Sequence, residues 1–286
     1  MRRQAGFTLV ELVMVIALAG IVAVMISTVL VRPMQGLIDQ SRRAELVDQT
    51  SLALSRMARD IRLAVPNSVR VQGGDLELLR IHAAGRYLPN RAGAEGLRFA
   101  PGNATDCTVP GNDCQSFVVL DPALPVATAR WLVLYNVGAE SGGVPVAGSN
   151  LWAAAAADGR HVISPSGSSL SFTAGTGQGV LRLVPPGGSF AFSFASPQRR
   201  FYLADEVLGL RCDLANRRLL RYTRTTLAPA FSAAQSEVLA SDVTRCAFSY
   251  QPGSQQRAGL VSLNLGLSRD GESVELLQQV QVDNAP

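Results

Sequence analysis

Lysine is absent from the 286 residues of this chain, so each of its 26 basic side chains is an arginine. Histidine occurs only twice, cysteine four times, and aromatic residues make up 6% of the sequence. The formal net charge of +4 is too small to indicate nucleic-acid binding by itself, so we expect no nucleic-acid partner. A composition this poor in histidine and cysteine also offers few ligands for a metal site.

Sequence motifs of enzymes are missing as well. The chain contains no G-x-S-x-G elbow, no H-E-x-x-H pair, no P-loop and no C-x-x-C pair. His82 and His161 have no acid or nucleophile partner that can be identified in the sequence. Five carboxylates of the later chain do not follow the spacing of a calcium loop: Asp75, Glu77, Asp205, Glu206 and Asp213. We therefore predict a protein that is not an enzyme, with no catalytic residue, no cofactor and no metal site.

One long apolar run is present near the N-terminus. From Phe7 to Val31 the sequence is FTLVELVMVIALAGIVAVMISTVLV, in which Glu11 is the only charged residue. A helix of about 25 residues is about 37 Å long, enough to cross a bilayer core of about 30 Å. A short basic leader, residues 1–6, precedes this run. Because a charge inside a membrane segment is costly, Glu11 is a candidate functional residue.

The stretch Gly6-Phe7-Thr8-Leu9-Val10-Glu11-Leu12, followed by about twenty apolar residues, resembles the N-terminal signature of type IV prepilins and type II secretion pseudopilins. The resemblance implies that a membrane prepilin peptidase cleaves the chain between Gly6 and Phe7 and then N-methylates Phe7. It also implies that Glu11 directs assembly with other pilin or pseudopilin subunits and an inner-membrane assembly platform. The alternative is an uncleaved signal anchor with a stray glutamate, whereas a secretory signal peptide fits poorly because its apolar region is shorter.

Elementary electrostatics is compatible with that role. After cleavage the free amine of Phe7 and the carboxylate of Glu11 lie four residues apart, about 6 Å along the helix. In a stack of such helices, the amine of one subunit can pair with the carboxylate of its neighbour, which offsets the cost of burying both charges. Arg2 and Arg3 favour a cytoplasmic leader. We therefore expect a single-pass protein of the bacterial inner membrane, with its C-terminal head in the periplasm.

The region from 32 to 65 has the periodicity of an amphipathic helix. Apolar residues expected to face the core recur at helical spacing: Leu37, Ile38, Ala44, Val47, Leu54, Met57, Ala58, Ile61 and Val65. Pro33 predicts a kink or a local break between the membrane half and this half, and Pro66 predicts the end of the helix. The expected divisions are thus residues 1–6 (leader), 7–31 (membrane and assembly helix), 32–65 (periplasmic half) and 66–286 (head).

Beyond Pro66 the pattern changes to that of strands. Alternating or apolar segments predict a β-rich head: 69–71, 75–82, 116–120, 129–136, 190–194, 201–203, 207–214, 219–223, 238–243, 246–250, 260–268 and 274–282. Turn residues separate several of them, including Gly73-Gly74 and Asp270-Gly271. Residues of about 138–188 are rich in Gly, Ser, Ala and Pro and predict a loop-rich middle. We expect an α+β, pilin-like fold with a long N-terminal helix packed on an antiparallel head.

Four cysteines in an exported domain predict disulfides. Cys107 and Cys114 bracket a Pro-Gly turn, and a bond between them would stabilise by about 2–3 kcal/mol. Metal binding is the alternative for this pair, but it needs further ligands. Pairing Cys212 with Cys246 would close a larger loop and contribute about 3–4 kcal/mol.

The C-terminal part narrows the resemblance. Its L-x-C-D…R-L-L-R hairpin, its S-D-V-T-R-C-A-F-S-Y strand and its closing Q-V-Q-V-D-N-A-P resemble minor pilins of mannose-sensitive haemagglutinin (MSHA) pilus biogenesis, the MshO type. That resemblance implies a minor pilin that takes part in assembly or initiation of a type IV pilus. The alternatives are a J-type pseudopilin of type II secretion and a tip adhesin or binding subunit. No family resemblance covers residues of about 85–190.

Overall fold

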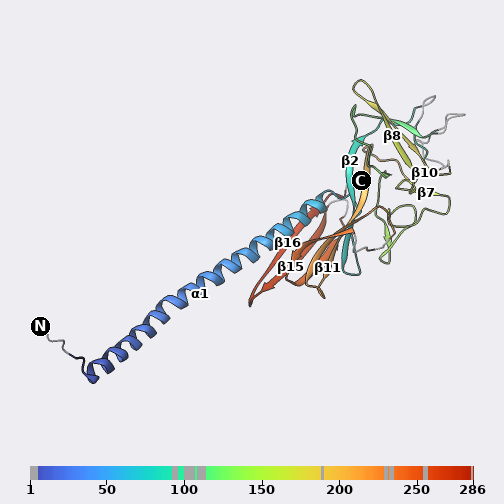
Figure 1. Ribbon diagram of the computed structural model, residues 1–286. Helices are drawn as coiled ribbons and strands as arrows, with labels where there is room; N and C mark the ends of the chain where they lie inside the picture. The colour runs from blue at the N-terminus through green and yellow to red at the C-terminus, as the bar shows by residue number, and fades with distance from the viewer. Residues whose placement is uncertain are drawn as a thin grey trace.

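The structure is a computed structural model. It describes residues 6–91, 96–99, 107, 114–187, 190–228, 231, 235–253, 257–284 and 286, and the side chains of residues 29–39 lie outside that description. One long helix extends from the N-terminal end into a β-rich head, in which the paired strands are almost all antiparallel (Figure 1). This is the α+β, pilin-like architecture that the sequence predicts.

The helix α1 spans Leu9–Arg62, 54 residues or about 80 Å. It is continuous through Pro33, so the break expected there is not present. Proline removes a single backbone donor, and the long helical segments on both sides keep the remaining hydrogen bonds.

The helix also ends three residues before the predicted position of Val65. Beyond Arg62 the backbone forms hydrogen bonds with strand β2 (Asp75–Arg86) in place of helical ones. The amide of Val65 donates to the carbonyl of Leu79, and the amide of Ile81 donates to the carbonyl of Leu63.

The first sheet forms the centre of the head. Its strands lie in the order β1 (Arg70–Gln72), β2 (Asp75–Arg86), β11 (Arg200–Asp213), β12 (Arg218–Arg224) and β13 (Ser236–Ser241), and β4 (Trp131–Val133) also pairs with β11. The β1–β2 turn uses Gly73 and Gly74, both at positive φ, as the sequence predicts. Two predicted strands, 201–203 and 207–214, are one strand β11 with irregular register between Leu203 and Val207.

The second sheet is C-terminal and contains β14 (Val243–Gln251), β15 (Gly259–Arg269) and β16 (Glu272–Val282) in that order. Asp270 and Gly271, both at positive φ, form the predicted turn between β15 and β16. This sheet lies alongside the helix (Figure 1), and α1 packs on β16 and β15.

The middle region holds a third sheet, of β3 (Ser116–Val119), β9 (Gly179–Val184) and β8 (Ser169–Ala174). Four shorter strands accompany it as two pairs: β5 (Glu140–Ser141) with β6 (Val144–Pro145), and β7 (Arg160–His161) with β10 (Ala191–Phe192). The stretch expected to be loop-rich therefore contributes strands and buried side chains, among them Leu151, Val162, Ile163, Leu181 and Leu183.

The upper half of α1 supplies one side of the main core. Buried helix residues pack against side chains of the first and second sheets: Leu46, Ala53, Leu54, Met57, Ala58 and Ile61. Near the start of this packed segment, the buried face of the helix differs from the predicted one. Ala44 and Val47 were expected to face the core but are exposed, whereas Leu46 and Thr50 are buried. This packing holds the helix rigidly against the head from about Leu46 onward.

Candidate processing and assembly site

The predicted cleavage site lies in extended chain before the helix. Gly6 and Phe7 have no helical structure, and 79% of the Phe7 surface is exposed. A Cβ at Gly6 would meet no atom within 4 Å, so the bond between the two residues is accessible from this side. Leader residues 1–5 lie outside the described residues. The structure thus presents the Gly6–Phe7 bond without cover from the head.

Thr8 begins the helix. It has extended backbone angles, and its Oγ1 accepts a hydrogen bond of 3.3 Å from the amide of Glu11. This is an N-cap, the arrangement that satisfies a backbone donor left free at a helix start. Glu11 stands in the first turn, where the helix dipole favours a negative charge. The short Thr-x-x-Glu sequence therefore marks both the start of the helix and the position of the carboxylate, and this capping pattern could have been recognised in the sequence.

The helix that follows has the dimensions of a membrane span. Leu9–Thr28 has a mean hydropathy of 2.8, and none of it is buried by the head. The hydroxyl of Thr28 is satisfied inside the helix, because it donates to the carbonyl oxygens of Val24 and Met25. Apart from Glu11, this span presents only uncharged side chains to its surroundings.

The Glu11 carboxylate is the exception. Within the part of the chain that the structure describes, no cation or hydrogen-bond donor contacts its side chain, since the bond to Thr8 involves only the backbone amide of Glu11. Inside a membrane or a bundle of apolar helices, such a carboxylate would be stabilised by a partner from outside the chain. The geometry is suited to an intermolecular contact.

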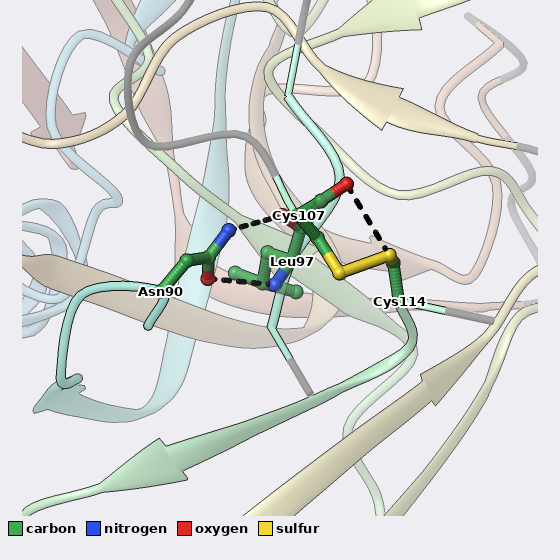
Figure 2. The surroundings of a disulfide bond; sticks show 4 residues. All are labelled: Asn90, Leu97, Cys107 and Cys114. Atoms are coloured by element: carbon green, nitrogen blue, oxygen red, sulfur yellow. Dashed lines mark hydrogen bonds between the residues drawn. A yellow bond between two sulfur atoms is a disulfide. The ribbon is translucent and has the colours of Figure 1, made fainter. Parts of the chain in front are cut away.

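Both predicted disulfides are present. Cys107 and Cys114 are bonded with Cα atoms 5.9 Å apart, and Figure 2 shows their bond beside the carbonyl of Cys107. In the same view Asn90 forms two hydrogen bonds with the backbone of Leu97, of 2.7 and 3.0 Å. Cys212 and Cys246, with Cα atoms 5.7 Å apart, join β11 of the first sheet to β14 of the second.

A polar cluster that sequence reasoning missed surrounds Arg80 on β2. The irregular register of β11 places Asp205 and Glu206, neighbours in sequence, both against the Arg80 guanidinium. His82 Nδ1 lies 3.6 Å from Asp205, and the Thr128 hydroxyl lies 3.3 and 3.4 Å from the two ring nitrogens of His82. Because the hydroxyl is about equally far from both nitrogens, it is not aligned with either for proton transfer.

The second histidine is part of the packing. His161 is buried, its Nδ1 accepts from the amide of Val162, and its Nε2 donates to the carbonyl of Ala153. Burial lowers the pKa of this imidazole below its ordinary value, despite the opposing effect of the bond to Ala153. Among the described residues no group of three His, Cys, Asp or Glu side chains is placed to hold a metal ion. The prediction that the protein is not an enzyme is left as a prediction.

Comparison with known proteins identifies the N-terminal segment. Residues 1–27 match a family described as the prokaryotic N-terminal methylation motif. Comparison with curated proteins found no match, and neither did comparison with solved structures. The matched residues include the exposed Gly6–Phe7 bond, the Thr8 cap and Glu11, whose carboxylate has no partner among the residues that the structure describes. The chain therefore carries a type IV pilin-like N-terminal methylation motif at the start of a helix that can span a membrane.

Proposed function

We propose that this chain is a minor pilin that takes part in the assembly or initiation of a type IV pilus of the MSHA kind. In this proposal a prepilin peptidase cleaves between Gly6 and Phe7 and methylates the new amine. The exposed helix then leaves the membrane for the fibre, and Glu11 pairs with the amine of a neighbouring subunit. The head stays on the periplasmic side of the inner membrane until the subunit is incorporated into the pilus or at its tip.

One observation carries the proposal. The matched methylation motif ends in a helix whose first 20 residues are apolar and uncovered, with a single carboxylate that has no partner within the described chain. A membrane anchor alone gains nothing from that carboxylate, because a charge in a membrane segment is unfavourable. An assembly contact gives the charge a partner and makes one register between helices more stable than the others.

The carboxylate is tested by replacing Glu11 with Ala in the full chain. We expect normal cleavage but a loss of incorporation into fibres of at least about ten-fold, since one member of a buried ion pair is removed. Ile16→Ala is the matched control, because Ile16 is 63% exposed on the same helix and carries no charge. Immunoblots of sheared fibres and of membranes give the ratio. Wild-type incorporation of the Glu11 variant would overturn the assembly role.

Processing is tested separately by mass spectrometry of the mature protein. We expect a chain that begins at Phe7 and carries one extra methyl group, and a Gly6→Leu variant that retains the six-residue leader. A wild-type chain that still begins at Met1, or a processed Gly6→Leu variant, would contradict the proposed cleavage site.

The type II secretion pseudopilin remains the nearest alternative function, because the same helix and carboxylate serve both kinds of fibre. Genes for a pilus beside the locus would favour the pilus, and genes for secretion would favour the pseudopilin. For a tip adhesin, deletion of residues 138–188 is not an informative test, because this stretch supplies core residues such as Leu151 and Ile163. Surface substitutions that leave fibre number unchanged but abolish attachment are the appropriate test for adhesion.

A further inference from the structure

Strand β8 (Ser169–Ala174) forms an open edge at the end of the head far from the N-terminus (Figure 1). It pairs with β9 on one side only, in a register without shifts. On the other side, no described residue forms a backbone hydrogen bond with it. An edge of this kind presents a row of free amides and carbonyls to a further strand.

The other outer edges of the three larger sheets are protected. Helix α1 packs on β16, and β14 carries Arg245 beside a register shift. Strand β1 has three residues and β13 carries Glu237. The free side of β3 is taken by backbone hydrogen bonds with residues 86–88. By contrast β8, Ser-Leu-Ser-Phe-Thr-Ala, has no charge, no proline and no bulge, the devices by which proteins usually prevent edge pairing.

The side chains of β8 form two different faces. Ser169, Ser171 and Thr173 are exposed on the outer face. Leu170 and Phe172 pack on a second apolar cluster, which includes Phe117, Leu181 and Phe201, but both are only half-buried at this edge of the sheet. The Phe172 ring lies over Gly179 of β9, at a position where a Cβ would not fit. A further strand would complete the burial of both apolar side chains.

We propose that the partner of this edge is β8 of a second copy of the chain, paired antiparallel about a two-fold axis at Ser171. In that register Leu170 lies opposite the partner's Phe172, and Ser169 lies opposite the partner's Thr173. Residues directly opposite each other share one face of a sheet, so apolar side chains meet on the core face and hydroxyls meet on the outer face. The two three-stranded sheets then become one sheet of six strands.

A second copy fits because the strand is complementary to itself. No charge is repeated across the axis, and the two-fold contact is the commonest geometry of homodimers. The contact is at the far end of the head, so both helices are left free (Figure 1). Six residues bury much less than the roughly 1,600 Å² of a standard interface, so the contact is weak and forms where copies are concentrated, as in a membrane.

Cysteine cross-linking of the full chain in its native membrane tests the register. Ser171→Cys places two thiols opposite each other, with Cα atoms about 4.5–5.5 Å apart, within the range of a disulfide. Ser169→Cys is the matched control, because its two copies would be about 14 Å apart along the strands. We expect a disulfide-linked dimer for Ser171→Cys at a yield at least about ten-fold above that of Ser169→Cys.

A second experiment makes the test independent of position 171 as a cross-linking site. Co-expressed Ser169→Cys and Thr173→Cys chains should form a mixed disulfide, and adding Ser171→Lys to both should abolish it through like charges on the axis. Equal cross-linking of Ser169→Cys and Ser171→Cys, or no dimer for Ser171→Cys, would overturn the proposal. An adduct whose mass is not twice that of the chain would show a different occupant and overturn it as well.

Discussion

Two glutamates in apolar surroundings show how the two regions of this molecule differ. Glu77 lies on β2 in the head and is 6% exposed. Its carboxylate accepts hydrogen bonds from Arg70 at 2.6 and 3.0 Å, from Arg224 at 2.7 Å and from the Tyr222 hydroxyl at 2.8 Å. Glu11 lies in the uncovered helix and has no such partner within the described chain.

The difference separates a region that compensates its buried carboxylate from one that leaves its carboxylate uncovered. The Glu77 carboxylate is compensated by the chain itself, because Arg70, Arg224 and Tyr222 all contact it. The lower helix, Leu9–Thr28, buries nothing against the head, and its one charged residue, Glu11, has no partner among the described residues. The lower helix can therefore span a membrane, whereas the upper helix, from Leu46 to Ile61, is part of the main core.

The largest expected effect is that of Glu77→Ala. The substitution leaves Arg224, which is 4% exposed, buried without its carboxylate, and we expect a loss of about 3–5 kcal/mol in the free energy of unfolding of the head. Urea unfolding of the detergent-solubilised chain measures it. Glu11→Ala is the matched control and should leave this free energy unchanged. Similar losses for both variants would mean that Glu11 also has a partner within the chain.

The same cluster predicts sensitivity to acid. Burial by itself would raise the pKa of Glu77, but the hydrogen bonds from Arg70 and Tyr222 and the charges of Arg70 and Arg224 together lower it below its ordinary value of 4.5. A carboxyl group whose pKa is lowered on folding contributes stability above its unfolded pKa and loses it as the pH falls through the folded pKa. Unfolding free energies measured from pH 6 down to about pH 3 should therefore decrease less for Glu77→Gln than for the wild type. Parallel pH profiles would contradict the lowered pKa.

Removal of the disulfide between the first and second sheets should have the next largest effect on stability. Replacing Cys212 and Cys246 with Ala should lower the unfolding free energy by about 3–4 kcal/mol, because this disulfide closes a loop with a sequence separation of 34. The Cys107–Cys114 disulfide closes a shorter loop, with a separation of 7, so replacing both of its cysteines should cost only about 2–3 kcal/mol. If calorimetry gave the larger loss of unfolding free energy for the Cys107–Cys114 variant, the entropy of the unfolded chain would not be the main source of the stabilisation by these disulfides.

Substitution of two methionines allows a direct comparison of the two halves of α1. Met57 is fully buried in the main core, whereas Met25 on the same helix is 62% exposed. Met57→Ala should lower the unfolding free energy of the head by about 3 kcal/mol through lost contacts and a cavity. Met25→Ala should leave it unchanged in detergent. A comparable loss at Met25 would mean that the lower half also packs against the head.

The smallest effect concerns the start of the helix. Thr8→Ala removes the side chain that caps the amide of Glu11, at a cost of about 1 kcal/mol, so we expect that amide to exchange about five-fold faster in micelles. Thr28→Ala is the control, since its hydroxyl bonds only within the helix and far from that amide. Unchanged exchange in Thr8→Ala would show that the cap contributes nothing to the first turn.

Local features of the chain were predictable because neighbouring residues determine them. The motif around Gly6 and Glu11, the apolar span, and the β1–β2 and β15–β16 turns all depend on residues a few positions apart. Pro33 was misjudged, since one missing donor does not interrupt a helix that is stable on both sides. The rotated core face near Leu46 was also missed, because periodicity gives a stripe but not the sheet that covers it.

The sequence alone therefore determined the character of the N-terminal region: a methylation motif, a helix long enough for a membrane and one carboxylate in an otherwise uncharged span. Only the tertiary structure decided how the head compensates its own charges and which edge it leaves open. Glu77 meets Tyr222 and Arg224 across separations of 145 and 147 residues, and Arg80 meets Asp205 across 125. Contacts at such separations depend on strand order and register, and a shift of one residue would turn these side chains to the opposite face.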